Sequence, residues 1–498
     1  MTLSEAREEL KRLEMEEFAY GYAMGSLHYD GETGAPRDTY IPRGKALGIL
    51  SGVGYQLATG ERSERLLDAL SEHMDELTSA ERRTVELRQK DLRELKSIPM
   101  DEYVAYRELL NESHIVWTEA KERDDFASFE PVLQKIIDDN RRFAALAAPD
   151  TDPYDYCLDK YEEGLTMERC DRFFGVLRDK LVPLIEKVKR AEAPDTSLLG
   201  VNFPLDRQEK LSYKLMDLLG LDRSRCRLGT TEHPFTLDLS KYDVRITTHY
   251  YENAFASSMF SVVHEGGHAL YELHTADEYA YTGLGGGVSM AVHESQSRFF
   301  ENIIARSRPF CEHIWPTLVE LCPELGKYSA KDFYRAVNTS KPSLIRIEAD
   351  ELTYSLHIMV RYELERAFMH GELEARDLPS AWKELYRKYL GVEVPDDRSG
   401  VLQDSHWSGG QIGYFPSYAL GSAYGAQIVA KMKETVDVDE CVAAGDLSPV
   451  CAWLEERIWR HGKLYKPTEL IENAMGAPFD AKFYTDYLEA KMAAVYRF

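Results

Sequence analysis

Two histidines and a glutamate near the middle of the chain have the spacing of a metal site. In the segment His264-Glu265-Gly266-Gly267-His268 the imidazoles are four residues apart, so both rings point the same way on a helix. Neutral imidazole is a good zinc ligand, and the carboxylate beside the first ring could take a proton from metal-bound water. The segment therefore predicts a metal site with a general base next to it.

A catalytic zinc ion usually has three protein ligands and an open position for water. We take Glu294 as the third ligand, because a helix that returns after the glycine-rich turn Gly283–Gly287 would bring it opposite the two histidines. His293 is the rival, since imidazole is an equally good ligand. The glycines lack the strand-to-helix context of a nucleotide-binding loop, which favours a tight turn between two helices.

The elements around this segment must hold the ligands in place. We predict a helix over residues 254–274 that shows the histidines to a cleft and packs its other side into the core. The apolar side consists of Met259, Val262, Val263, Ala269, Leu270 and Leu273. Gly266 and Gly267 together cost on the order of 2 kcal/mol relative to Ala in a helix. We therefore expect another backbone, or the substrate, to pass close to this turn.

Helical patterns dominate the rest of the chain, with one exception. The segment Thr78-Ser79-Ala80-Glu81 predicts a capping box that starts a helix, and Pro99 ends that helix. Apolar residues alternate with polar ones over residues 235–239 and 243–248, which predicts two short antiparallel strands just before the metal helix. The edge of such a sheet could bind an extended peptide. The stretch Ala191–Pro204 predicts a loop between an N-terminal lobe, roughly residues 1–195, and a lobe of roughly residues 205–498.

Composition excludes several classes of partner. The formal net charge of −25 repels phosphate backbones and anionic membranes, so we expect no nucleic-acid or membrane partner. Neither a secretory signal nor a membrane-spanning stretch stands out, which predicts a soluble, cytoplasmic protein. The seven cysteines are scattered without a Cys-x-x-Cys pair, and we expect free, mostly buried thiols rather than metal ligands.

Five motifs in order resemble those of the thermostable carboxypeptidase Taq family of metallopeptidases. They are Asp243–Thr247, His264–His268, His293–Gln296, Ile345–Asp350 and Gly400–Trp407. The resemblance implies a single catalytic domain, residues 1–498, with a mainly α, two-lobed fold, a deep substrate groove and a small antiparallel β-sheet beside the metal helix. It also implies a homodimeric metallocarboxypeptidase that releases single residues, with broad specificity, from peptides with a free C-terminus.

The same resemblance implies roles for the metal segment. His264, His268 and Glu294 would bind the metal, and Glu265 would act as general base and then as general acid. The residue types alone support the same roles, because a metal at such a site lowers the pKa of bound water from about 15.7 towards 7 and Glu265 is placed to accept the proton. Zinc is the expected ion, and cobalt or manganese would suit the same ligands.

Two further tasks need residues beyond the metal ligands. The oxyanion formed at the peptide carbonyl needs hydrogen-bond donors; the resemblance implies His406 and Tyr418 for this task, while Tyr414 is another hydroxyl in the same tyrosine-rich segment. A free carboxylate is best held by an arginine. The resemblance implies Arg346 first, with Arg245 as a second clamp or as support for the small sheet.

Two alternatives stay open at this point. An oligopeptidase that cuts short peptides internally would use the same metal chemistry, and it would cleave free and amidated peptides equally. A helical scaffold with a purely structural metal would favour a closed site of four ligands, whereas this sequence offers three ligands and a glutamate placed to act on water.

Overall fold

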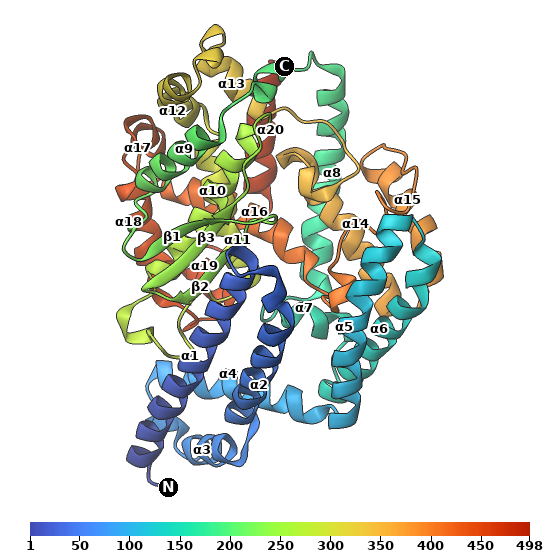
Figure 1. Ribbon diagram of the computed structural model, residues 1–498, viewed down its shortest axis with the longest axis vertical. Coiled ribbons are helices and arrows are strands. Elements are labelled where there is room, and N and C mark those ends of the chain that lie inside the picture. Colours follow the sequence, from blue (N-terminus) through green and yellow to red (C-terminus); the bar gives the residue numbers. More distant parts are fainter.

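The computed structural model describes residues 1–498 except the side chain of Arg37. The chain is mainly α-helical, as predicted, with one small sheet (Figure 1). The helices are α1 Leu3–Thr33, α2 Tyr40–Thr59, α3 Glu61–Ser71, α4 Ser79–Ser97, α5 Met100–Arg123, α6 Phe126–Ala147, α7 Pro153–Asp159, α8 Met167–Arg190, α9 Leu205–Leu218, α10 Phe255–Leu273, α11 Met290–Arg298, α12 Arg308–Leu321, α13 Ala330–Val337, α14 Glu351–Met369, α15 Leu378–Tyr389, α16 Phe415–Met432, α17 Val438–Ala444, α18 Ser448–Arg457, α19 Pro467–Met475 and α20 Lys482–Tyr496. A π-helical segment, η5 Phe299–Ala305, continues α11, and a short 3₁₀ turn, η7 Arg346–Glu348, precedes α14.

Local signals in the sequence set several of these boundaries. At the start of α4 the Thr78 hydroxyl accepts a hydrogen bond from the Glu81 N–H, and the Glu81 carboxylate accepts one from the Thr78 N–H. This is the predicted capping box, which satisfies two backbone donors that have no partner within the helix. The helix ends at Ser97, two residues before Pro99, because a residue that precedes proline disfavours helical geometry.

The sheet has three strands, β1 Cys226–Thr230, β2 Thr236–Ser240 and β3 Asp243–Thr248, in the order β1-β3-β2. The predicted antiparallel pair is confirmed, since β2 and β3 run in opposite directions. The sheet as a whole is mixed rather than antiparallel, because β1 pairs with β3 in parallel. Our prediction missed β1 because its alternation of apolar and polar residues covers only Cys226–Leu228 and stops at Gly229. β2 is an edge strand.

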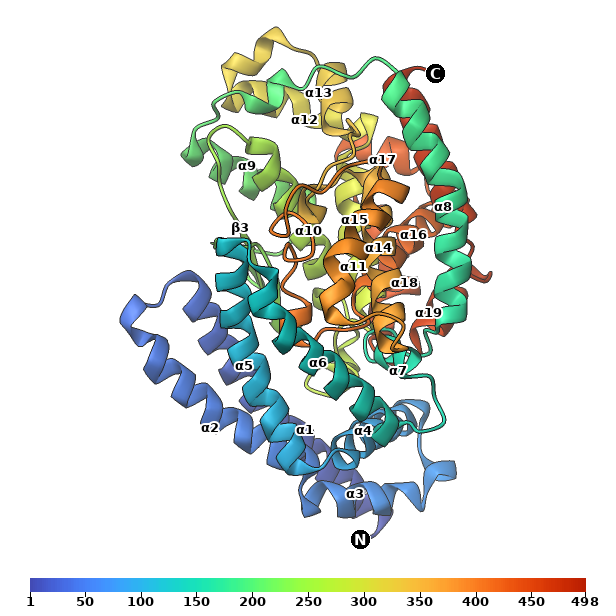
Figure 2. The same cartoon turned by 90° about the vertical axis from the view of Figure 1, so that its right-hand side faces the viewer.

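The N-terminal helices have a small core of their own. The apolar residues buried among α1, α3 and α4 are Ala6, Leu10, Leu13, Leu66, Leu67, Leu70, Leu77 and Val85. A second, much larger core extends from Leu109 to Tyr496. In Figure 2, α8 runs along α20 on the side of the molecule away from α1 and α2. The stretch 191–204 is irregular apart from one 3₁₀ turn, while the division into two lobes at this place stays a prediction.

Close packing of α11 against α10 positions the metal segment. A Cβ atom at Gly267 would lie 2.7 Å from the carbonyl oxygen of Gln296 and 2.8 Å from the Cα of Ser297. The expected close backbone is therefore that of α11. At Gly266 the close neighbour is a side chain, since a Cβ atom there would lie 2.6 Å from Leu219 Cδ1.

Two further expectations, the buried side of α10 and the free cysteines, are also met. The apolar side of α10 is buried as predicted, with Val262, Val263 and Ala269 fully enclosed. All seven cysteines are free, and five of them are buried. Among the described residues, no helix combines the length and apolar character needed to cross a bilayer.

Candidate metal centre and its cavity

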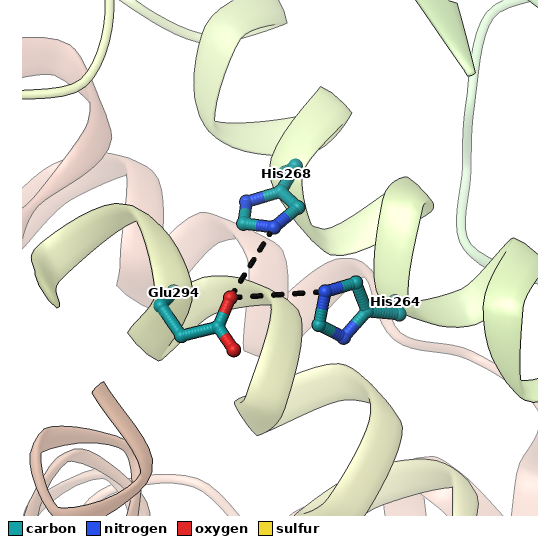
Figure 3. Close-up of side chains that lie close together, drawn as sticks. All are labelled: His264, His268 and Glu294. Carbon is teal, nitrogen blue, oxygen red and sulfur yellow. Dashed lines mark ion pairs between the residues drawn. The ribbon is translucent and has the colours of Figure 1, made fainter. Parts of the chain in front are cut away.

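The structure brings His264, His268 and Glu294 together, as predicted from their spacing (Figure 3). Glu294 Oε2 on α11 lies 3.7 Å from His264 Nε2 and 3.5 Å from His268 Nε2 on α10. One ligand atom from each residue falls within 4.8 Å of the others. Two imidazole nitrogens and one carboxylate oxygen are a donor set that suits zinc and leaves a coordination position for water.

Buried or half-buried partners hold each of these three side chains. His264 Nδ1 lies 2.9 Å from the carboxylate of Glu301 on η5, and His268 Nδ1 lies 2.6 Å from Nδ1 of His293. The Glu294 carboxylate accepts a hydrogen bond of 2.7 Å from Arg298 Nε. His293, the rival ligand in the sequence, therefore contacts His268 on the side away from Glu294.

The pKa shifts of Glu294 and His268 favour the forms that bind a cation, whereas the carboxylates of Glu294 and Glu301 outweigh burial and raise the pKa of His264. Burial opposes the charged form of Glu294, but the nearby Arg298 and His264 outweigh it and hold the pKa of Glu294 well below its usual range. Burial lowers the pKa of His268 to about 4. An ionised carboxylate and a neutral imidazole are the forms that bind metals.

Glu265 faces the same space from the adjacent helix position. Its carboxylate accepts a hydrogen bond of 2.6 Å from the Thr236 hydroxyl on the edge strand β2. Burial raises the pKa of Glu265, which makes this carboxylate a stronger base than an exposed one.

A cavity of about 1160 Å³ surrounds the site and runs along α10 from Ala256 to Glu272. The metal cluster and Glu265 line it, together with residues of β2, η7, the start of α14 and α16. The cavity therefore combines a cation site, a buried carboxylate and the edge of a small sheet.

The other predicted residues take different places around this cavity. Arg346, Tyr414 and Tyr418 line it, whereas His406 and Arg245 are not among the described residues that do so. His406 contacts the cavity wall through Tyr418, whose hydroxyl lies 3.1 Å from His406 Nε2.

Arg245 belongs to the junction between the sheet and α1. Its guanidinium donates hydrogen bonds of 3.0 and 2.9 Å to Asp243 and stacks 4.9 Å above the ring of Tyr29. These contacts tie β3 to α1.

Arg346 is buried in the cavity wall and held in one orientation. Its Nε and Nη2 atoms lie 2.9 and 2.8 Å from Asp404 Oδ1, and its Nη1 donates to the Tyr354 hydroxyl at 3.1 Å. Asp404 is shared with Arg361, which donates a hydrogen bond of 2.7 Å to its other oxygen. A planar guanidinium fixed in this way can present its remaining N–H groups to a carboxylate.

Comparison with known proteins agrees with the family that the motifs suggested. A family model described as carboxypeptidase Taq (M32) metallopeptidase matches residues 9–492. The chain belongs to this family. The M32 family members are metallocarboxypeptidases, so the protein is a hydrolase of this type, and the family implies a divalent metal.

Relatives of the M32 chain match over nearly their whole length. Carboxypeptidase 1 of Bacillus subtilis is 40% identical over 480 residues, which cover 96% of both chains. Thermostable carboxypeptidase 1 of Pyrococcus furiosus is 36% identical over 478 residues, covering 95% of this chain and 96% of the relative. The crystal structure of an M32 carboxypeptidase from Deinococcus radiodurans R1 has a TM-score of 0.96 at 36% identity, over 99% of this chain and 100% of that chain.

Sequence reasoning about this M32 chain missed the residues that support the ligands. Glu301 lies seven positions after Glu294, a spacing that would place both on nearly the same face of a regular α-helix. Glu272 lies four positions after His268, one helical turn further on. Both signals are weak in a chain with 85 acidic residues.

Proposed function

We propose that the protein removes single residues from the C-terminus of peptides, with broad specificity, by means of a metal held by His264, His268 and Glu294. The observation that carries this proposal is the cluster of these three side chains with Glu265 in one cavity. Zinc is the expected ion, and cobalt or manganese would also suit the donors. When bound there, the ion supplies Lewis-acid chemistry, which includes lowering the pKa of water.

Glu265 moves the proton in this reaction. Its carboxylate accepts a proton from the attacking water and delivers it to the amine of the departing residue. The hydrogen bond from Thr236 fixes the direction of the carboxylate, and burial raises its pKa, which favours proton uptake.

Tyr418 and His406 act as a pair on the oxyanion. Burial lowers the pKa of His406 to about 4, so its ring is neutral near pH 7. If Nε2 carries the proton, His406 donates to the Tyr418 oxygen and leaves the Tyr418 O–H free to donate to the oxyanion. Burial raises the pKa of Tyr418 well above its usual range, so this hydroxyl keeps its proton.

Arg346 recognises the free carboxylate of the substrate, and β2 binds its backbone. Arg346 lies in the cavity wall with its guanidinium 5.1 Å from the ring centroid of Tyr418. β2 is an edge strand of the sheet and lines the cavity, so an extended peptide can pair with its free side. Arg245 joins β3 to α1 through Asp243 and Tyr29 and does not contact substrate.

Several wider properties stay predictions. We expect a homodimer in the cytoplasm, with one catalytic domain of two lobes. We expect peptide substrates and no nucleic-acid partner, because the net charge of −25 repels phosphate backbones.

The test compares one mixed-sequence peptide as free acid and as C-terminal amide, each with and without a chelator, by mass spectrometry. We expect stepwise shortening from the C-terminus of the free acid only, abolished by the chelator and restored by zinc. Internal cleavage of both forms would establish the oligopeptidase instead. No cleavage after metal is restored would leave only a structural role for the metal.

A further inference from the structure

A chain of hydrogen-bonding groups lies behind His268, on the side away from Glu294. His268 Nδ1 is 2.6 Å from His293 Nδ1, and His293 Nε2 is 2.7 Å from Glu272 Oε1. The same Glu272 oxygen accepts a hydrogen bond of 2.9 Å from the Gly287 N–H. Glu272 is only 5% exposed, so its carboxylate depends on these protein partners.

Only one distribution of protons allows His268 to bind a metal in this arrangement. The Nε2 atom of His268 faces Glu294 and must carry a lone pair to act as a ligand, so the proton of the neutral ring is on Nδ1. That N–H needs an acceptor, and the nearest one is Nδ1 of His293. His293 must then carry its own proton on Nε2, where Glu272 accepts it.

The two histidines of the metal site are therefore supported in different ways. His264 Nδ1 contacts the carboxylate of Glu301 directly, at 2.9 Å. The Nδ1 atom of His268 instead contacts the ring of His293, whose Nε2 contacts the Glu272 carboxylate. The tautomer of His268 consequently depends on a neutral side chain that can both accept and donate.

The glycine-rich turn between α10 and α11 encloses this pair. A Cβ atom at Gly286 would lie 2.9 Å from Glu272 Oε2, and a Cβ atom at Gly287 would lie 2.5 Å from His293 Cδ2. Gly286 also has a φ of +79°, a conformation that other residues rarely adopt. The absence of side chains at these positions lets the turn close over the Glu272 carboxylate and the His293 ring.

We propose that His293 and Glu272 are positioning residues that fix the tautomer and the ring orientation of His268 for metal binding, and that Gly286 and Gly287 enclose them. The proposal rests on the proposed ligands His264, His268 and Glu294. It gives a role to the glycine-rich turn and to His293, which was the alternative to Glu294 as third metal ligand.

A matched pair of substitutions at His293 tests this directly. An asparagine places its amide oxygen near the position of Nδ1, so His293→Asn keeps an acceptor for His268. A glutamine reaches the position of Nε2, so His293→Gln keeps the contact with Glu272 and loses that acceptor. We expect His293→Gln to weaken zinc binding by about 10- to 100-fold, as loss of such an outer partner does elsewhere, and His293→Asn to stay close to the wild type.

The readout is the zinc dissociation constant, measured by competition with a coloured chelator in the absence of peptide. The control is His274→Gln at the end of α10, where His274 Nδ1 contacts only the Leu270 carbonyl oxygen, at 2.8 Å, and zinc affinity should not change. The visible spectrum of the cobalt-loaded protein should keep its band positions in His293→Gln, because no ligand is lost.

Three results would overturn the proposal. They are an unchanged zinc affinity in His293→Gln, an equal loss in both variants, and a shift of the cobalt bands that marks His293 as a ligand. If His293→Gln fails to fold, Glu272→Gln removes the charge while keeping an acceptor oxygen, and a zinc affinity equal to that of the wild type would count against the role of Glu272. Failure of the proposed function itself is distinguishable, because the wild-type protein would then bind zinc without releasing C-terminal residues, or would not bind it at all.

Discussion

Gly267 sets the distance between the two helices that carry the metal ligands, and replacing it by alanine should separate them. The added Cβ atom would lie 2.7, 2.8 and 3.0 Å from three backbone atoms of α11, none of which can rotate away. Carbon atoms pack best at about 3.5–4.0 Å, so α11 must move by about 0.8 Å or more. Glu294 moves with it.

Two effects of opposite sign then compete. Alanine is a better helix former than glycine by about 1 kcal/mol, whereas overpacking a rigid contact costs about 1–3 kcal/mol. We expect a net loss of about 1 kcal/mol in the free energy of unfolding of Gly267→Ala. Because metal–ligand distances tolerate only about 0.2 Å, we also expect zinc affinity to fall by at least tenfold.

A second glycine provides the control. Gly175 lies within α8, and a Cβ atom there would meet nothing within 4 Å. Gly175→Ala should therefore stabilise the protein by up to about 1 kcal/mol and leave zinc affinity unchanged. Denaturant unfolding and chelator competition measure both quantities for each variant. If Gly267→Ala proves as stable as Gly175→Ala and binds zinc like the wild type, the reasoning about helix spacing is wrong.

The remaining predictions concern the cavity and His406, which lies behind its wall. Glu265→Gln should lower kcat by about 10²- to 10⁴-fold in steady-state assays while zinc affinity stays near that of the wild type; a wild-type kcat would exclude Glu265 as the base. Arg346→Lys keeps a charge beside Asp404 but loses the planar fork, so KM for free-acid peptides should rise by about tenfold or more and their preference over amides should shrink. An unchanged preference would remove Arg346 from carboxylate recognition. Tyr418→Phe should reduce kcat by about 10²- to 10³-fold with little change in KM, and a loss confined to KM would contradict the oxyanion role. Because burial lowers the pKa of His406 to about 4 from an unfolded value of 6.5, the unfolded chain takes up this proton first and stability should fall as pH drops from about 6.5 to 4. Unfolding curves of His406→Gln should show a shallower pH dependence across this range, and an identical slope would refute the assignment.

The metal helix could be predicted from the sequence because its pattern is local. Apolar residues at helical spacing placed one side of α10 in the core, and the four-residue spacing placed His264 and His268 on the other. The two glycines predicted a close neighbour, and α11 is that neighbour at Gly267. These features depend only on helix geometry, which is the same in every protein.

Features that depend on contacts between distant segments could not be predicted in this way. Glu294 and His293 are adjacent, so their side chains point about 100° apart, and the rotation of α11 that decides between them comes from its packing on α10 and α16. β1 becomes a strand by pairing with β3, although its own sequence has little alternation. Arg245 has the residue type of a carboxylate clamp, but its pairing with Asp243 places it at the sheet.

The central claim is that His264, His268 and Glu294 hold the metal in the cavity that contains Glu265. Anomalous diffraction at the zinc absorption edge, from crystals of the zinc-loaded protein, tests it most directly. We predict a single strong peak between His264 Nε2, His268 Nε2 and the Glu294 carboxylate, with His293 outside the coordination sphere. A peak coordinated by His293 in place of Glu294, or a peak outside this cavity, would contradict the account.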